Sequence, residues 1–237
     1  CQVLAQAGMK VVVADLDQQR CDSVAVELAA SGGAALGVTV DVSSSTSIRR
    51  MVDTVLMRYG CIDVLVNNAG VIELGSVVDL PEEKWDRVVT VNLKGAFLCA
   101  QAVVPGMIER QCGRIINVAS VAAKRPAPLQ SAYAATKHGL VGLTQVWCQE
   151  LAPHRITVNT VCPGFIDSPM WAEHLAPAYA PHFGVAPEML VATLAKTLMP
   201  LGEPQQPADI GEAIAYLCQA DNVTGQCLAV DGGYSMD

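Results

Sequence analysis

A short apolar strand runs directly into small and polar residues in the stretch Ile62-Asp63-Val64-Leu65-Val66-Asn67-Asn68-Ala69-Gly70. The apolar part predicts a buried strand over Ile62 to Val66, which is typical of a parallel sheet covered by helices on both faces. The small residues that follow would let a ligand approach the backbone at the carboxyl end of the strand. A plain turn is the alternative, because Asn and Gly are common turn formers. We expect Asn68, Ala69 and Gly70 to line a ligand site.

Strand-like and helix-like segments alternate on both sides of this stretch. Strands are predicted over Lys10–Ala14, Ala34–Val40, Ile62–Val66, Gly113–Val118, Arg155–Thr160 and Gln226–Val230. Helices are predicted over residues 1–7, 18–30, 44–59, 81–109 with a break near Asn92-Leu93, 132–152 and 209–217. Strands separated by helices predict an α/β fold with a doubly wound parallel sheet. The 237 residues fit one such domain, over residues 1–237.

The composition narrows the class of protein. Hydrophobic residues make up 51% and charged residues 16% of the chain, which excludes disorder as the dominant state. The net charge of −8, without a Lys/Arg cluster, predicts no nucleic-acid partner. A membrane helix needs roughly 18 apolar residues. The longest candidate, Gly95 to Ile108, is interrupted by Gln101 and Pro105, so we expect no membrane partner.

The chain contains nine cysteines but no Cys-x-x-Cys pair. Their odd number and their apolar neighbours predict free thiols in a reducing compartment, and therefore a cytoplasmic location. His174 and His182 are the other candidate metal ligands. They lie among prolines without a converging pair of carboxylates, so no metal site is predicted.

Two carboxylates follow predicted strands. Asp15, with Leu16 beside it, ends the first strand, where a carboxylate can accept both hydroxyls of an adenosine ribose and repel a 2′-phosphate. Asp41 and Val42 follow the second strand and are expected to contact an adenine edge. Capping of the next helix is the alternative for both Asp15 and Asp41.

The most informative group is Ser120, Tyr133 and Lys137. Tyr133 and Lys137 are four residues apart and therefore share one helix face, and Ser120 follows the fourth strand. An isolated Tyr has a pKa of about 10, which a nearby ammonium group is expected to lower. Tyr133 would then exchange a proton with an alcohol or carbonyl that Ser120 holds. The alternative for Tyr133 is an amphipathic residue on a half-buried helix.

Further short motifs occur along the chain. The set comprises Asn67-Asn68-Ala69-Gly70, Val91-Asn92, Ser120 thirteen residues before Tyr133, Tyr133-x-x-x-Lys137, Pro163-Gly164 and Val230-Asp231-Gly232-Gly233. With these motifs the chain resembles the short-chain dehydrogenase/reductase family from residue 1 to 237. The resemblance implies a Rossmann-like single domain. It also implies an oxidoreductase that transfers a hydride between NAD(H) and a secondary alcohol or ketone.

The resemblance implies a role for several residues. It implies a catalytic tetrad of Asn92, Ser120, Tyr133 and Lys137, in which Asn92 supports a water that relays protons to Lys137. Tyr133 and Lys137 would also contact the cofactor, Lys137 at the nicotinamide ribose. The remaining implied cofactor contacts are Pro163, Gly164, Ile166 and Ser168, the last in place of the Thr that is usual in the family.

The acidic Asp15, with no basic residue directly after it, resembles family members that prefer NAD over NADP. One alternative function is a non-catalytic NAD-binding sensor or scaffold on the same fold, although such members typically lose tetrad residues. Another is an epimerase or dehydratase, which needs a larger carboxyl-terminal domain than the few residues after Gly233. Candidate substrates are polyols or sugars, 3-hydroxyacyl compounds, and small or steroid-like ketones.

Residues 168–200 are rich in Pro and apolar side chains. We interpret this segment as a lid that excludes water from the substrate. The alternative is a surface that packs against another domain or subunit. The resemblance also implies that helices near residues 94–110 and 136–151 pair subunits, so a homotetramer is expected first and a homodimer second.

The chain lacks the family's opening strand and its Thr-Gly-x-x-x-Gly-x-Gly turn. Residues 1–7 resemble the end of the helix that follows this turn, which implies that about 20–25 residues are missing. The missing strand would be central, between Lys10–Ala14 and Ile62–Val66, and the turn would bind the pyrophosphate. We therefore expect the 237 residues to be a fragment of the functional protein, with a destabilised sheet.

Overall fold

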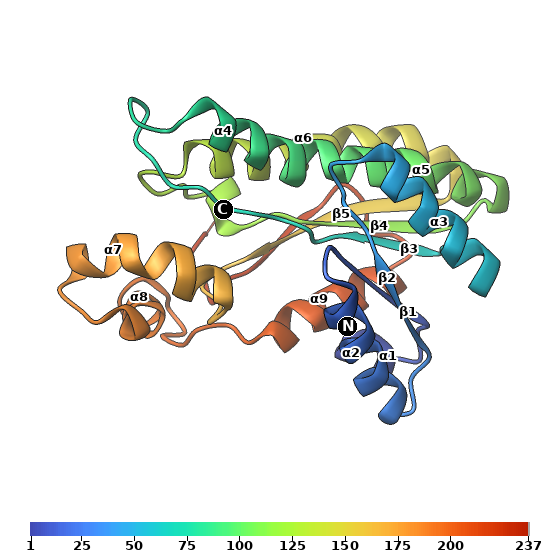
Figure 1. Ribbon diagram of the computed structural model, residues 1–237, viewed down its shortest axis with the longest axis horizontal. Coiled ribbons are helices and arrows are strands. Elements are labelled where there is room, and N and C mark those ends of the chain that lie inside the picture. The colour runs from blue at the N-terminus through green and yellow to red at the C-terminus, as the bar shows by residue number, and fades with distance from the viewer. Residues whose placement is uncertain (237) are drawn as a thin grey trace.

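Six parallel strands form the centre of the computed structural model, which describes residues 1–236 (Figure 1). The strands are β1 Val11–Asp15, β2 Ala35–Thr39, β3 Val64–Asn67, β4 Gly113–Val118, β5 Ile156–Pro163 and β6 Cys227–Val230. The α-helices are α1 Gln2–Gln6, α2 Gln18–Ala30, α3 Ser45–Tyr59, α4 Glu82–Val89, α5 Gly95–Arg110, α6 Ser131–Leu151, α7 Ala176–Phe183, α8 Leu190–Leu198 and α9 Pro207–Gln219. Shorter helical turns are η1 Thr90–Lys94, η2 Val121–Ala123, η3 Ala152–His154, η4 Trp171–Leu175 and η5 Pro187–Met189.

The helices cover both faces of the strands. Figure 1 shows α3, α4, α5 and α6 on one face and α1, α2 and α9 on the other. Every strand pair in the described residues is parallel. Parallel strands with helices on both faces form a doubly wound α/β fold, so the predicted fold class is confirmed.

The strands pair in two groups. β1 pairs with β2, and the other four follow the order β3-β4-β5-β6. The break lies between β1 and β3, where the sequence predicts a central strand that the chain does not contain. The prediction that the functional protein has this strand stays a prediction.

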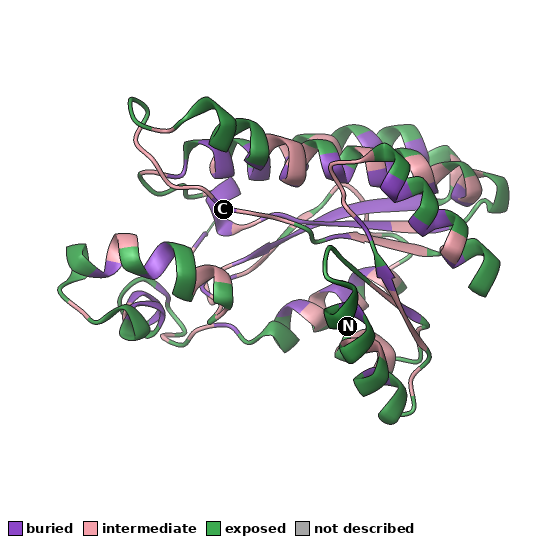
Figure 2. Cartoon of the chain, viewed as in Figure 1, coloured by how far each residue is buried: buried purple, intermediate pink, exposed green. Residues whose placement is uncertain are grey.

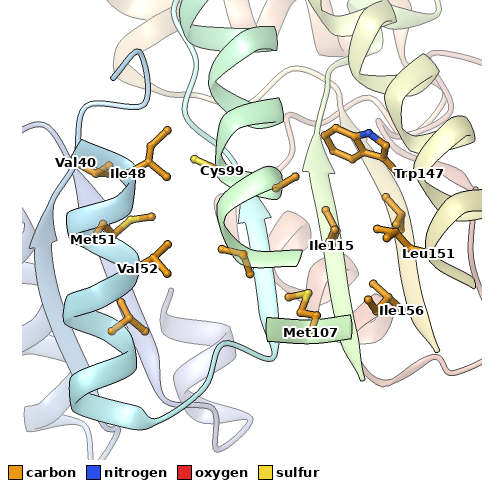
Figure 3. Packing of buried hydrophobic residues seen from close by; sticks show 14 of the residues in the cluster. Val40, Ile48, Met51, Val52, Cys99, Met107, Ile115, Trp147, Leu151 and Ile156 are labelled. Atoms are coloured by element: carbon orange, nitrogen blue, oxygen red, sulfur yellow. The ribbon is translucent and has the colours of Figure 1, made fainter. Parts of the chain in front are cut away.

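The main core lies between the four-stranded group and α3, α5 and α6. Figure 3 shows Ile48 and Met51 from α3 facing Cys99 and Met107 from α5, with Trp147 on the other side. The inner helix faces are buried and the outer faces are exposed (Figure 2). This arrangement holds α6, which carries the predicted catalytic pair, firmly against the sheet.

Near Asn92-Leu93, where the sequence predicts a break, the helix over Glu82–Arg110 departs from α-helical geometry but does not end. The chain instead widens into the π-helical turn η1 between α4 and α5, a feature that often marks functional sites. By its length of 29 residues and its mean hydropathy alone, this helix could cross a membrane. This was not expected from the sequence, because only apolar runs without polar residues or proline were considered there. It buries Ala100, Val103 and Met107 in the main core, as core helices do.

Candidate active site

Ser120, Tyr133 and Lys137 lie together at the carboxyl end of β4. Ser120 follows the strand and caps η2, because its Oγ accepts a hydrogen bond from the Ala122 N–H at 3.1 Å. Tyr133 and Lys137 are both buried and lie about one turn apart on one face of α6. The helical spacing that the sequence predicts is thus present, and the packing of α6 on the sheet turns both side chains toward Ser120.

The three side chains are in direct or close contact. The Ser120 side chain hydrogen-bonds the Tyr133 phenol, and the Lys137 Nζ lies 5.4 Å from the centroid of the Tyr133 ring. The Lys137 ammonium also donates a hydrogen bond of 2.8 Å to the carbonyl oxygen of Val118. The hydrogen bond to Val118, at the end of β4, therefore holds the Lys137 ammonium next to the Tyr133 ring.

Burial dominates the acid–base properties of this pair. It raises the pKa of Tyr133, although the hydrogen bond with Ser120 acts in the opposite direction. Burial also lowers the pKa of Lys137 to about 8. The expectation that Lys137 lowers the pKa of Tyr133 below its usual value is therefore wrong: the cost of removing the phenolate from water exceeds the stabilisation. At neutral pH the phenol is protonated and can act as an acid.

Asn92 lies in η1, and both polar atoms of its side chain make hydrogen bonds. Its Oδ1 accepts from the Val71 N–H at 2.8 Å, and its Nδ2 donates to the Val71 carbonyl at 2.9 Å and to Thr136 Oγ1 at 3.2 Å. A Cβ on Gly70 would lie 3.5 Å from Asn92 Oδ1 and 3.6 Å from Lys137 Nζ. Asn92 thus joins the loop after β3 to α6 beside Lys137, and its role in a proton relay stays a prediction.

Asp15 lies at the carboxyl end of β1 and is exposed. It is not the cap of α2, because Asp17 accepts hydrogen bonds from the Gln19 and Arg20 N–H groups. The Asp15 Oδ1 accepts one bond from the Asp17 N–H at 3.2 Å. Leu16 beside it is 70% exposed. An exposed carboxylate and an exposed apolar side chain at a strand end suit an adenosine ligand.

Asp41 follows β2 and organises the turn before α3. Its Oδ1 accepts hydrogen bonds from the Ser43 N–H at 2.8 Å and the Ser43 hydroxyl at 2.6 Å. These bonds, the side-chain one first, lower the pKa of Asp41. The helix cap is Ser44 rather than Asp41. Val42 packs on the first turn of α5, where a Cβ on Gly95 would meet Val42 Cγ2 at 3.0 Å.

β3 ends with a buried side chain, Asn67, that links neighbouring strands. Asn67 Nδ2 donates to Asn117 Oδ1 at 2.9 Å. Asn117 Nδ2 then donates to Thr144 Oγ1 at 2.8 Å, and Thr144 is hydrogen-bonded to Thr160 at 2.7 Å. This chain of bonds joins β3, β4, α6 and β5. The next residues, Asn68 and Ala69, are exposed and remain accessible to a ligand.

Pro163 and Gly164 lie at the carboxyl end of β5. Pro163 is the last residue of the strand, paired with Val230, rather than part of a turn. A Cβ on Gly164 would lie 2.4 Å from Gln205 Oε1 and 2.8 Å from the Asp231 Cα, so only glycine fits. The segment around Asp231 therefore packs directly against this end of β5.

The predicted cofactor contacts Ile166 and Ser168 lie just after Gly164, and Gln205 packs beside them. Ile166 forms a parallel bridge with Gln205, and Ser168 is partly exposed. Gln205 is buried, and its Oε1 has no hydrogen-bond partner in the described residues. No sequence motif singled out Gln205 or Thr136. Their place in the site is seen only in the structure, where Gln205 pairs with Ile166 and Thr136 hydrogen-bonds Asn92. The spacing of Thr136, three residues after Tyr133, is the one available hint.

The segment over residues 168–200 meets the catalytic group at one end. Tyr133 packs in a cluster with Ile72, Ala122 and Leu175, and Met170 and Trp171 lie against it. The rest of the segment forms a second apolar cluster over α7 and α8, seen in orange beyond the end of the sheet in Figure 1. Among residues 1–236, no group of three or more His, Cys, Asp or Glu could hold a metal ion.

The strand ends fit a nicotinamide cofactor. Asp15 presents an exposed carboxylate where a ribose is expected, Asn68 and Ala69 are exposed after β3, and Gly70 lies next to Asn92 and Lys137. The chain has no glycine-rich turn of the kind that binds a pyrophosphate, so we assign that contact to none of its residues.

Comparisons with known proteins agree with this arrangement. Residues 1–178 match the family model described as short chain dehydrogenase. The 3-oxoacyl-[acyl-carrier-protein] reductase of Thermotoga maritima is 39% identical over 233 residues, covering 98% of this chain and 89% of that protein.

Two solved structures are also similar. One is an actinorhodin polyketide ketoreductase with NADPH, with a TM-score of 0.93, 38% identity, and coverage of 98% of this chain and 90% of that one. The other is a 3-ketoacyl-(acyl-carrier-protein) reductase from Brucella melitensis complexed with NADH, with a TM-score of 0.87, 33% identity, and coverage of 99% and 91%.

Proposed function

Because the chain belongs to the short-chain dehydrogenase family, we propose that it is an NADH-dependent reductase of 3-oxoacyl groups. As a member of this family it is an oxidoreductase that transfers a hydride between a nicotinamide cofactor and a ketone or alcohol. The observation that carries the proposal is the buried contact of Ser120 with Tyr133 beside Lys137.

We assign the proton transfer to Tyr133. Its phenol is protonated at neutral pH, because burial raises its pKa, and it can therefore donate to the oxygen of a ketone. Ser120 donates a hydrogen bond to the same oxygen and holds it for the transfer. A nicotinamide cofactor held at the strand ends would supply the hydride for the carbonyl carbon. Lys137 stabilises the phenolate that develops on Tyr133.

We assign two supporting roles to the remaining residues. Asn92 holds the loop at Val71 against α6 and so keeps Gly70 next to Lys137. A water beside Asn92 would return the proton to Tyr133 through Lys137. Pro163, Gly164, Ile166 and Ser168 would orient the nicotinamide.

NAD(H) is proposed over NADP(H) because of Asp15. Its carboxylate is exposed and is not used as the helix cap, so it can accept the ribose hydroxyls. A 2′-phosphate would bring two negative charges against it. Asp41 and Val42 would contact the adenine, with Leu16, Asn68 and Ala69 near it.

A 3-oxoacyl substrate is proposed from the surroundings of Tyr133. Ile72, Leu175 and Met170 form an apolar wall beside the phenol, which suits an acyl chain better than a polyol. The similar ketoacyl reductases support the same substrate class. Residues 168–200 would close over this chain as a lid within the single domain.

The protein is also proposed to form a homotetramer, or else a homodimer, through α5 and α6. Phe97, Val104, Pro105, Trp147 and Leu151 line a groove on the outer side of these two helices, and the Phe97 and Trp147 rings lie 6.5 Å apart. A second copy would cover this apolar surface. Light scattering on the purified protein measures the oligomeric state, and a monomer at micromolar concentration would contradict the assignment.

A cytoplasmic location is proposed from the nine cysteines, which are all free in the structure. Buried and half-buried free thiols of this kind are usual where thiols are kept reduced.

The test is reduction of acetoacetyl thioesters with NADH, followed by the absorbance of the reduced nicotinamide. Tyr133→Phe removes the proton donor, so turnover should fall at least about 100-fold while binding of NADH stays measurable. Tyr216 is 57% exposed on α9, and Tyr216→Phe is the matched control with unchanged turnover. Substantial activity in Tyr133→Phe would reject the mechanism. Turnover of polyols alone would reject the substrate class.

A further inference from the structure

Two cysteine side chains meet between the paired strands β5 and β6. Cys162 on β5 and Cys227 on β6 have their Sγ atoms 3.2 Å apart. Cys162 immediately precedes Pro163 and is fully buried, whereas Cys227 is partly exposed. Both pack in one small core cluster with Leu140 of α6.

The sulfur of Cys162 is also close to the catalytic residues. The backbone of Ser120 hydrogen-bonds this sulfur in its ionised form. A charge on the same sulfur raises the pKa values of both Tyr133 and Lys137. A change of charge at Cys162 therefore alters the electrostatic surroundings of Tyr133 and Lys137.

We propose that Cys162 and Cys227 form a reversible redox modification site, at which a peroxide converts the two thiols into a disulfide and thereby inactivates the enzyme. Cys227 is the residue that reacts with the peroxide, because it is the more exposed of the two. Cys162 is the resolving residue, because it is buried against Cys227.

The pKa values of the two thiols favour a reaction in which Cys227 reacts first and Cys162 second. A hydrogen bond from the Cys162 thiol lowers the pKa of Cys227 to about 7, and the same pairing raises the pKa of Cys162. The positive charge of Lys124 favours ionisation of both. The thiolate is the nucleophile toward peroxides, so Cys227 reacts first.

The reaction balances in two steps. The Cys227 thiolate attacks one peroxide oxygen, the O–O bond breaks, and Cys227 becomes a sulfenic acid as hydroxide leaves. The Cys162 sulfur then displaces the sulfenic hydroxyl as water, and the S–S bond forms. Overall, two thiols are oxidised by two electrons and one hydrogen peroxide is reduced to two waters. A small dithiol reverses the change by thiol–disulfide exchange.

The bond requires the strand ends to move. Cys162 pairs with Ala229 and Cys227 with Thr160, so the two cysteines are diagonal neighbours in the sheet. Their Sγ atoms lie 3.2 Å apart, whereas a disulfide holds the two sulfurs at about 2.05 Å. Closing the bond therefore pulls on Pro163 and Gly164. A misplacement of about 1 Å at an active site can cost about 100-fold in rate.

The experiment treats the reduced protein with hydrogen peroxide, stops the reaction by alkylation, and maps the peptides by mass spectrometry. We expect a peptide that links Cys162 to Cys227, a fall in kcat/KM of at least about tenfold, and recovery with dithiothreitol. Cys227→Ser should start with normal activity and resist the peroxide. Cys148→Ser is the matched control, because Cys148 is a half-buried thiol that approaches β6 at Gly225, and it should be inactivated like the unmodified protein.

Two results would overturn the proposal. One is inactivation of Cys227→Ser at the rate of the unmodified protein. The other is an inactivated unmodified protein whose peptide map lacks the Cys162–Cys227 link. The peptide map uses no variant, so it decides the proposal even where Cys227→Ser fails to fold.

Discussion

The two groups of parallel strands differ in how far they are buried. All eight residues of β5 and five of the six in β4 are buried. β1 and β2 each bury one residue, Val11 and Val38, and α1 buries none. Figure 2 shows the same contrast between the central strands and the region of α1 and α2. β3 buries one residue and β6 none, so the contrast rests on β4 and β5. Apolar burial stabilises strands roughly in proportion to the area removed from water, so β4 and β5 make the four-stranded group the more stable part of the molecule.

The site residues divide between the same two regions. Ser120, Tyr133 and Lys137 lie on or against the four-stranded group, whereas Asp15 and Asp41 lie at the ends of β1 and β2. Catalytic groups need fixed positions, and a densely packed region provides them. We therefore expect stability and catalysis to depend on the four-stranded group, and selection between cofactors to depend on the two-stranded group.

The largest effect is expected at Asn117, which joins Asn67 to Thr144 inside the four-stranded group. Asn117→Ala leaves the buried Asn67 amide without its hydrogen-bond acceptor and removes one of the two hydrogen bonds of Thr144. We expect the free energy of unfolding to fall by about 2–4 kcal/mol, measured by urea denaturation.

The matched change in the two-stranded group is Thr39→Ala. Thr39 also makes a side-chain hydrogen bond, to Gln18, but it is exposed. Its loss should change the free energy of unfolding by no more than about 0.5 kcal/mol. Equal losses at Asn117 and Thr39 would contradict the difference in stability between the two groups.

Much of the fold could be predicted from local sequence patterns. The bounds of α2 and β4 agree with the prediction because flanking residues mark them, such as Asp17 as a helix cap and Gly113 at the strand start. β3 begins later than predicted, at Val64 rather than Ile62, because its pairing with β4 begins there. Hydropathy marks which residues are apolar, whereas the partner strand decides where pairing begins.

The candidate site was predictable where it depends on spacing and unpredictable where it depends on packing. Tyr133 and Lys137 share a helix face because they are four residues apart. The direction of the Tyr133 pKa depends on burial beside Ile72 and Leu175, which come from distant segments. The meeting of Cys162 and Cys227 likewise arises only when β5 pairs with β6.

A smaller effect is expected from Asp15→Ala, which changes the two-stranded group alone. Loss of the carboxylate removes a partner of the ribose hydroxyls and a repulsion against a 2′-phosphate. The ratio of kcat/KM with NADH to that with NADPH should fall about tenfold, while the free energy of unfolding stays nearly constant. Asp17→Asn removes the neighbouring charge but keeps the cap, and it should leave the ratio nearly unchanged. An unchanged ratio in Asp15→Ala would remove the basis for NAD(H) preference.

The smallest effect concerns pH and follows from the burial of Lys137 against the four-stranded group. Its pKa is lowered to about 8, so its positive charge is lost at lower pH than for an ordinary lysine. About nine tenths of Lys137 is charged at pH 7 and about half at pH 8, so kcat/KM for reduction should fall about twofold between them. The raised pKa of Tyr133 keeps the proton donor intact over this range, so the decline reports Lys137. A pH profile of kcat/KM, which reflects groups of the free enzyme, measures it. A profile that stays flat until above pH 10 would show that Tyr133 alone sets the alkaline limit and that the charge on Lys137 does not assist the proton transfer.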